Sequence, residues 1–438
     1  MKQIYIVTGD FPPSSKVGAL RPFRLAKHLS NSGWQVDIIT KHSNSKFSHN
    51  QDLLNELNSY VRIHYLPGFK NATNRRAGST YFPGKELRVL EKFLARGKGA
   101  AVDVLSRYVK PDREIVNVPR YVFKFLAIYK KNKKSVVLTT SPPHSIHLVG
   151  AFISRFIKIP HVIDFRDPWD GYLERGKNEI VHPVDRFLER LVVKQSTAVV
   201  STTKQYNENL IARHFDIKKT KFQYVTNCYD VQKTGVAAEK APDKFIISYT
   251  GIFYSEKDPF TFFRALRSWF DRLREGEREL IENTLEVKLI GAYTRHVANV
   301  IERMNLSKVI RFIERVPHEE AVRLTRMSDM ALICAGIGEK SRPGWLPSKL
   351  IEYLGCNIPI LAICREGEIA RVIRETNSGY VVTSENHQLI QSILENEIHK
   401  KFFRNHDTTF SFQGIEQFQE SAVMGKFSKI LDKIVEMA

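Results

Sequence analysis

The sequence is poor in cysteine. Its 438 residues include only four, at Cys228, Cys334, Cys356 and Cys364. None of them forms a C-x-x-C pair or stands near histidines at the spacing of a zinc site. The sequence therefore predicts buried free thiols in a reducing compartment, and it gives no support to a disulfide or metal framework.

Long apolar runs are also missing. The most hydrophobic segments contain a lysine or arginine every few residues, so none has the length that spans a bilayer. The first residues, MKQIYIVTG, form a short apolar run without the long apolar core and small-residue cleavage site of a signal peptide. We therefore expect a cytoplasmic protein that does not cross the membrane, with association at a membrane surface left open.

Basic residues outnumber acidic ones. The formal net charge is +20, which attracts three classes of anion: nucleic acids, anionic lipid surfaces and phosphorylated small molecules. The basic residues are spread through both halves of the chain, and no nucleic-acid-binding module is recognisable. We expect no nucleic-acid partner.

Strands and helices alternate along two successive runs of the chain. The first run begins with a strand at Ile4–Val7, the loop GDFPPSSKVG, a helix at about Leu20–Ser32 and a strand at Val36–Thr40. The second begins at FIISYTG and ends with PILAIC and its helix. Between them, VQKTGVAAEKAPD is polar and aperiodic, which is typical of a linker.

This alternation predicts an α/β protein with two Rossmann-like, doubly wound domains facing a central cleft. The first domain is expected at 1–236 and the second at 237–405. Residues 406–438 are expected to form a helix that packs back on the first domain.

Two basic amphipathic stretches interrupt the first run at 85–134. Aromatic and aliphatic residues alternate there with lysines and arginines, and the apolar members are Phe93, Leu94, Tyr121, Phe123, Phe125, Leu126 and Tyr129. This pattern fits a surface that lies on anionic lipid. It fits equally well a solvated helix pair whose apolar side belongs to the core.

An anion site is predicted in SRPGWLPSKLIEYLGCNIPILA. Pro347 suits the first turn of a short helix that Gly355 closes. The free amides at Ser348 and Lys349 would then offer a site for a diphosphate. Glu352 lies one turn further along the same face and could accept hydrogen bonds from ribose hydroxyls. The alternative is a helix start with an exposed lysine and a solvated glutamate.

A second helix start of this kind occurs in TGIFYSEKDPF. The strand ends in Gly251, and Asp258 and Pro259 have the character of an N-cap and a first helical residue. Lys257 would then stand at a helix N-terminus beside a bound anion. The alternative for Lys257 is an ordinary surface charge.

The first domain offers a third anion-binding element in FPPSSKVGALR. Gly18 would let the backbone approach an anion closely, with Lys16 and Arg21 on either side. A simple tight turn is the alternative for Gly18.

Polar groups also follow two strands of the first run. Arg166 and Asp167 stand at the carboxyl end of the strand HVIDF, where open α/β sheets place their active groups. A structural ion pair beside a packed tryptophan would explain DFRDPW as well. His144 and His147 follow SPP and could line an acceptor site or belong to a capped helix start.

Five segments in chain order resemble glycosyltransferase family 4, whose members are retaining enzymes of the GT-B type. They are FPPSSKVGALRPFRLAKHLSNSGWQVDIIT, IDFRDPW, QYVTNCYD, TGIFYSEKDP and PSKLIEYLGCNIPILA. The resemblance implies an acceptor-binding first domain and a nucleotide-sugar-binding second domain. It also implies donor contacts from Gly18, Gly251, Lys257, Val316, Pro317, Pro347, Ser348, Lys349, Leu350 and Glu352.

For the reaction, the resemblance assigns Arg166 and Asp167 to the reacting sugar and its acceptor. Lys16, Arg21 and His144 are expected on the acceptor side. Two positions depart from the family pattern, because Ile252 stands where an arginine is usual and Gly344 where many members have a glutamate. Glu339, five residues before Gly344, is the candidate to replace that glutamate.

The expected activity is transfer of a hexosyl or N-acetylhexosaminyl group, with retention, from a nucleotide-diphosphate sugar to a glycan or lipid-linked acceptor in surface polysaccharide biosynthesis. The sequence has no D-x-D pair, so we expect neither a metal nor another cofactor. Two alternatives stay open: a sugar-nucleotide epimerase of the same fold, and a non-catalytic protein that binds nucleotide sugars.

Overall fold

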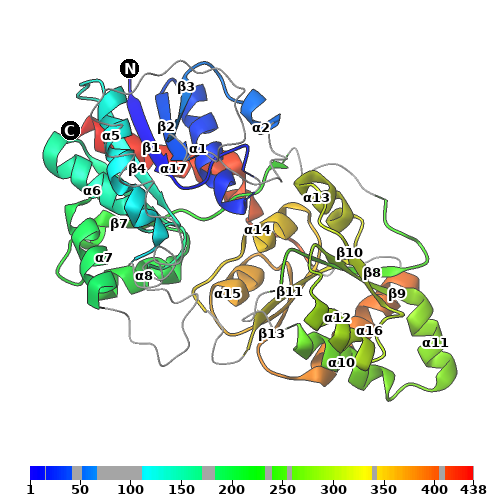
Figure 1. Cartoon of the computed structure of the whole chain (residues 1–438). Coiled ribbons are helices and arrows are strands. Elements are labelled where there is room, and N and C mark those ends of the chain that lie inside the picture. Colours follow the sequence, from blue (N-terminus) through cyan, green and yellow to red (C-terminus); the bar gives the residue numbers. More distant parts are fainter. Residues whose placement is uncertain are drawn as a thin grey trace, which may run out of the picture.

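The computed structural model describes most of the chain as two α/β domains (Figure 1). The described residues are 1–14, 16–41, 52–66, 111–169, 183–231, 239–253, 259–337, 343–403 and 410–437.

The first domain is built on a parallel sheet. Within the described residues the sheet has seven strands in the order β3-β2-β1-β4-β5-β6-β7. Their bounds are β1 Gln3–Thr8, β2 Gln35–Lys41, β3 Val61–Leu66, β4 Ser135–Ser141, β5 His161–Phe165, β6 Ala198–Ser201 and β7 Phe222–Tyr224. In the centre, Ile6 pairs with Ile38 on one side and Leu138 on the other. The central strands β1 and β4 are buried along their whole length because helices cover both faces of the sheet.

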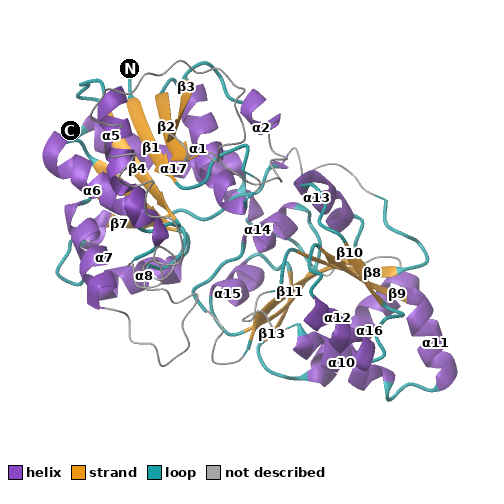
Figure 2. Cartoon of the chain, in the orientation of Figure 1, coloured by secondary structure: helices purple, strands orange, loops and turns teal. Residues whose placement is uncertain are grey.

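Helices form a layer on each side of this sheet (Figure 2). The helices of the domain are η1 Val17–Ala19, α1 Leu20–Asn31, α2 Asp52–Asn55, η2 Arg113–Asn117, α5 Val118–Ile128, α6 Ile146–Ile157, α7 Pro183–Gln195, α8 Lys204–Arg213 and η3 Lys219–Lys221. α1 packs on one face, with Leu25 and Leu29 against Ile4 and Ile6. α5 and α6 pack on the other.

The second domain repeats the plan. Its described residues form a six-stranded parallel sheet in the order β10-β9-β8-β11-β12-β13. The strands are β8 Phe245–Thr250, β9 Leu285–Ile290, β10 Ile310–Ile313, β11 Met330–Gly336, β12 Ile360–Cys364 and β13 Gly379–Val382. In both sheets the order reverses beside the first strand, between β1 and β4 and between β8 and β11. Open α/β sheets bind their ligands beyond the carboxyl ends of the strands at this point.

Two helical layers enclose the second sheet as well. The helices are α10 Phe260–Phe270, α11 Glu275–Thr284, α12 Arg295–Arg303, α13 His318–Arg326, α14 Ser348–Gly355, α15 Glu368–Glu375 and α16 His387–Phe403. α10, α12 and α16 share one core with the sheet, and α14 and α15 share the other. The prediction of two Rossmann-like, doubly wound domains is confirmed.

The end of the chain returns to the first domain (Figure 1). After η4 Ile415–Phe418, the helix α17 Glu420–Glu436 packs into the core of the first sheet through Met424, Phe427 and Leu431. Just before α17, Gln419 forms a parallel bridge with Tyr229. The chain therefore crosses between the domains at two neighbouring points.

Side chains also join the domains directly. The Thr203 hydroxyl donates to the carbonyl of Gly344 over 2.9 Å, and the backbone N–H of Gln205 donates to the Glu368 carboxylate over 2.8 Å. These contacts hold the loop before α14 against the start of α8.

All four cysteines carry free thiols, and Cys228, Cys334 and Cys364 are buried. Among the residues that the structure describes, no helix combines the length and hydropathy needed to span a bilayer.

Candidate donor and acceptor site

α14 begins at the domain junction, directly after Pro347. The extended backbone of Pro347 ends the preceding loop, and its carbonyl accepts the Leu350 amide over 3.1 Å. Leu350 is fully buried and anchors the first turn in the core. The amides of Ser348 and Lys349 belong to this first turn, where a helix has no internal acceptor for them. The helix start is therefore suited to an anion.

The ammonium group of Lys349 lies at the carboxyl end of β8. It donates to the Thr250 carbonyl and sits 3.6 Å from the centre of the Tyr249 ring. Gly251 follows in the left-handed region, with φ of +96°. A Cβ atom there would lie 3.4 Å from Lys349 Nζ. The glycine thus leaves room for the lysine. The Lys349 ammonium group, the end of β8 and the start of α14 therefore lie together and form a positively charged region.

Glu352 lies one turn further along α14. Its carboxylate is 2.8 Å from Nε2 of His318, the first residue of α13. Burial alone would raise the pKa of Glu352, but the His318 contact and the charges of Arg24 and Lys349 hold this pKa below its ordinary value. Glu352 is therefore a carboxylate at neutral pH, able to accept hydrogen bonds from hydroxyl groups. Val316 and Pro317 lead into His318 and so border the same place.

In the first domain, the Gly18 loop is held by Arg166. The guanidinium group donates to the carbonyl of Gly18, to that of Ser141 over 2.5 Å and to that of Pro142 over 3.2 Å. A Cβ atom on Gly18 would lie 2.8 Å from Arg166 Nη1. These backbone contacts give the guanidinium a structural role, and the catalytic role expected from the sequence stays a prediction. Arg166 fixes the Gly18 loop to the end of β4.

Arg21 also has a structural position. It forms a bidentate ion pair with Asp164 at 2.8 to 3.2 Å, and both side chains are buried. Its remaining donors reach the carbonyls of Val225 and Thr226. The prediction that Arg21 contacts an acceptor is therefore corrected: the residue joins α1 to β5 and to the segment after β7. Lys16 is exposed and pairs with Asp10 over 2.9 Å.

Aromatic rings line the carboxyl ends of β4 and β5. His144 is partly exposed and lies 5.2 Å, centroid to centroid, from the indole of Trp169. His147 is buried, and its ring meets Phe165 edge to face at 4.8 Å. Asp167 is partly exposed beside them, and its backbone carbonyl accepts a hydrogen bond from the Tyr206 hydroxyl. His144 and Asp167 thus stand at the same strand ends as the Gly18 loop.

Two family models match successive parts of the chain. The model described as a glycosyl transferase 4-like domain matches 20–228, and the model of glycosyl transferases group 1 matches 232–407. The chain belongs to glycosyltransferase family 4. Among curated proteins, none matches the sequence significantly.

Solved structures share the fold of this glycosyltransferase over its whole length. Sucrose-phosphate synthase from Thermosynechococcus elongatus is 14% identical with a TM-score of 0.67, and the match covers 100% of both chains. HepE from Anabaena, solved in complex with UDP, is 12% identical with a TM-score of 0.61, covering 99% of this chain and 100% of that one. A putative UDP-N-acetylglucosamine 2-epimerase from Listeria monocytogenes is 12% identical with a TM-score of 0.57, covering 100% and 98%.

Two predicted site residues of the glycosyltransferase, Lys257 and Glu339, lie outside the described residues. Two others were missed by sequence reasoning. His318 contacts Glu352. The sequence contained a signal for it, because His318 directly follows Val316 and Pro317, which are predicted to border the nucleobase. Arg24 reaches Glu420 at 3.1 Å and the Cys228 carbonyl at 2.6 Å, and its charge acts on Glu352. Its spacing after Arg21 gave no indication of this role.

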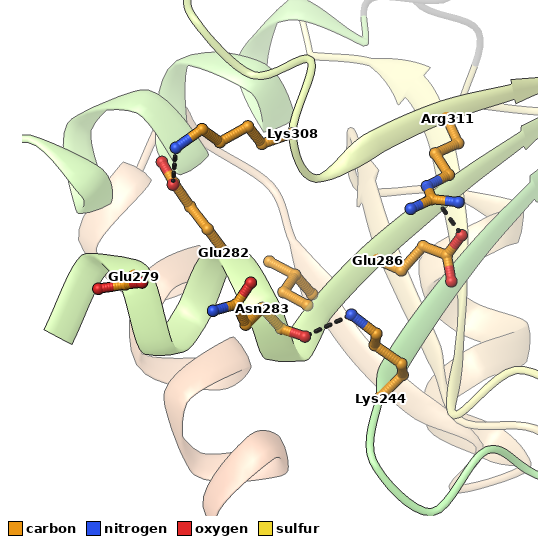
Figure 3. Close-up of a pocket in the computed structure, with 8 residues that line it drawn as sticks. Lys244, Glu279, Glu282, Asn283, Glu286, Lys308 and Arg311 are labelled. Carbon is orange, nitrogen blue, oxygen red and sulfur yellow. Dashed lines mark hydrogen bonds and ion pairs between the residues drawn. The ribbon is translucent and has the colours of Figure 1, made fainter. Parts of the chain in front are cut away.

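A cavity of about 300 Å³ lies away from these groups, at the amino ends of the strands of the second domain (Figure 3). Ion pairs cross its wall, with Lys308 to Glu282 at 2.7 Å and Arg311 to Glu286 at 3.4 Å. The predicted donor-binding groups lie at the opposite, carboxyl ends, so we assign the cavity no part in the predicted donor site. It is lined by Lys244, Glu279, Glu282, Asn283, Leu285, Glu286, Lys308 and Arg311.

Proposed function

We propose that this glycosyltransferase transfers a hexosyl or N-acetylhexosaminyl group from a nucleotide-diphosphate sugar to a glycan or lipid-linked acceptor, with retention of anomeric configuration. Surface polysaccharide biosynthesis is the process that we propose for it. The main support is the meeting of the α14 N-terminus, Lys349 and the carboxylate of Glu352 at the carboxyl end of β8. HepE, which has the same fold, was solved with UDP and with UDP-glucose.

In this proposal the second domain holds the donor. The amides of Ser348 and Lys349 and the Lys349 ammonium face the diphosphate, whose negative charge grows as the sugar leaves. Glu352 accepts from the ribose hydroxyls, and Val316 and Pro317 border the base. Fixed positive groups take the part that a metal ion would otherwise play, so we propose transfer without a metal. Activity that persists in excess EDTA supports this part of the proposal.

The first domain, in the same proposal, holds the reacting sugar and the acceptor. Arg166 fixes the Gly18 loop at the end of β4, which lets the Gly18 backbone approach the donor. Asp167 and His144 stand at the neighbouring strand ends and are proposed to contact the acceptor and the transferred sugar. Retaining transfer passes through an oxocarbenium-like centre, and water must be kept from this centre by the facing domains.

A panel of nucleotide sugars tests the function. Purified protein is incubated with UDP-, GDP- and TDP-linked hexoses and N-acetylhexosamines, and release of the nucleoside diphosphate is measured by chromatography. We expect one donor to be hydrolysed slowly without acceptor and to raise the melting temperature by mass action. The anomeric coupling constant of a product sugar then tests retention. Absence of release and of thermal stabilisation with every donor contradicts the proposal.

A sugar-nucleotide epimerase is the second candidate, and the fold shared with the Listeria protein favours it. An epimerised nucleotide sugar formed without release of nucleoside diphosphate would identify this activity. Ile252 and Gly344, the two departures from the family pattern, are the argument for a protein that binds nucleotide sugars without catalysis. Tight donor binding without turnover in the same panel would identify that case.

We further propose that the enzyme works at the cytoplasmic side of a membrane, where a lipid-linked acceptor would be located. The sequence left a lipid contact open as one of two alternatives for 85–134, of which the structure describes 111–134. Tyr121 and Phe125 from that prediction are fully buried and contribute to the core, so they are withdrawn as membrane contacts. Phe123 and Leu126 are exposed.

A further inference from the structure

Three neighbouring helices, α5, α6 and α7, cover one face of the first sheet (Figure 2). Their inner sides are apolar and belong to the core. Phe125 of α5 and Ile153 of α6 pack with the central strands, and Val192 of α7 packs near β5. The inner sides of these helices therefore supply all of their contacts with the domain core, and their outer sides are not needed for it.

The outer sides of the same helices carry large apolar side chains exposed to solvent. Phe156 and Phe187 are 65% and 64% exposed, and the exposed set is Phe123, Leu126, Phe152, Phe156, Val184 and Phe187. Phe152 and Phe156 lie one helical turn apart, with ring centroids 4.5 Å from each other. Single exposed apolar residues are ordinary, but a group on three adjacent helices indicates a binding surface.

The exposed charges on these helices are all of one sign. Within α5, α6 and α7, every residue of which the structure describes, the only acidic residues are Asp185 and Glu189, and both are buried. The exposed charged residues are basic: Arg155, Arg186, Arg190 and Lys194. Of these, Arg190 pairs with the exposed Asp216 after α8 at 2.6 Å, so the other three supply the net positive charge. The loop YKKNKK after α5 adds exposed Lys130, Lys131, Lys133 and Lys134.

We propose that the outer face of α5, α6 and α7 binds a membrane that contains anionic lipid. Aromatic side chains flanked by lysine and arginine are the groups that enter the interfacial region, where the rings reach the acyl boundary and the cations meet phosphate. A second copy of this chain fits less well, because a two-fold interface would place the same basic residues opposite one another. The inference concerns binding and does not rest on the transfer reaction, which the donor panel tests without vesicles.

Co-sedimentation of the full chain with vesicles tests this surface. The probes are phosphatidylcholine vesicles with and without 30% phosphatidylglycerol, at about 0.15 M salt. The first variant replaces Phe152 and Phe156 by serine, and the second replaces Arg155 and Arg186 by glutamine. We expect binding to the anionic vesicles only, and a loss of roughly tenfold or more in the partition coefficient for each double variant.

Matched controls come from surfaces away from this face. Replacement of Lys429 and Lys433 by glutamine removes two exposed charges from α17, on the opposite side of the same sheet, and Leu280→Ser removes an exposed apolar residue from the second domain. Both controls should bind as the unchanged protein does. An equal loss in the Lys429 and Lys433 variant overturns the proposal, because binding would then follow net charge alone.

Three other results also overturn it. The first is absence of binding to anionic vesicles, and the second is full binding by the phenylalanine variant. The third is a different partner for the same face. In that case the protein self-associates or binds single-stranded RNA, the phenylalanine variant abolishes this binding, and no vesicles are bound. Because the substituted side chains are exposed, the variants should keep the circular dichroism spectrum and melting temperature of the unchanged protein.

Discussion

Replacement of Arg21 by methionine distinguishes a structural arginine from an acceptor-binding one. Arg21 and Asp164 are 5% and 1% exposed, and the pair is bidentate. Without Arg21 the Asp164 carboxylate would stay buried, and among the described residues the Thr140 hydroxyl at 2.8 Å would remain as its hydrogen-bond donor. The carbonyls of Val225 and Thr226 would lose their donor as well.

The expected cost follows from this uncompensated charge. Breaking a buried ion pair by removing one partner typically destabilises a protein by about 3–5 kcal/mol. We therefore expect Arg21→Met to lower the free energy of unfolding of the first domain by about that amount, measured by urea denaturation followed by circular dichroism. The double variant Arg21→Met with Asp164→Leu should lose less than the single variant, because no buried charge is left without a partner.

The refuting result is specific. If Arg21→Met changes the free energy of unfolding by less than about 1 kcal/mol and instead raises the KM for acceptor, the side chain serves the acceptor and the structural assignment is wrong.

Three further predictions concern single residues. Glu352→Gln should raise the donor KM about tenfold to a hundredfold with little change in melting temperature, since a charged acceptor of ribose hydroxyls is lost; unchanged steady-state kinetics would contradict this role. Gly18→Ala should lower kcat/KM by up to about a hundredfold, because its methyl group displaces the Arg166 guanidinium and shifts the loop; full activity in the variant would exclude a close approach there. Burial lowers the pKa of His161 from its ordinary value of 6.5 to about 3. Between pH 6.5 and pH 3, His161 is therefore protonated in the unfolded chain and neutral in the folded chain. Stability from this group is therefore present above pH 6.5 and is lost as the pH falls toward 3. The loss from pH 7 to 5 is about 2 kcal/mol, and urea denaturation of His161→Gln at both pH values should show a correspondingly smaller loss.

Local patterns were enough to predict the fold. The apolar run at Ile4–Val7 and the amphipathic run that follows Gly18 predicted β1 and α1 to within one or two residues. Pro347 and Gly355 bounded α14 because backbone chemistry at helix ends depends on the residues at those positions. Such features depend on neighbours in the chain, and they are therefore visible in the sequence.

Side-chain roles were harder to predict because they depend on partners far away in the chain. Arg21 and Asp164 are 143 positions apart, and Arg166 and Gly18 are 148 apart. Both arginines looked suited to an anionic substrate, yet the fold uses them for a buried carboxylate and for backbone carbonyls. The contact between His318 and Glu352 spans 34 positions and was missed for the same reason.

The helix α5 shows what hydrophobic periodicity can and cannot predict about the orientation of side chains. Its 3.6-residue pattern predicted an amphipathic helix with basic and apolar residues, but the pattern alone left open which apolar residues face the sheet. The structure buries Tyr121 and Phe125 and exposes Phe123 and Leu126. The binding face that we propose continues onto α6 and α7, which only the tertiary structure brings together.

The central claim is that the start of α14 and its lysine hold a nucleoside diphosphate. Isothermal titration calorimetry of UDP and GDP with Lys349→Met tests it most directly, because methionine keeps an unbranched stem beside Tyr249 while the charge is removed. Lys429→Met on α17 is the control, and thermal unfolding verifies that both variants fold. We expect Lys349→Met to weaken the better-bound nucleotide about tenfold to a hundredfold and Lys429→Met to leave it unchanged. Equal affinity in a folded Lys349→Met variant and the unchanged protein would contradict the account.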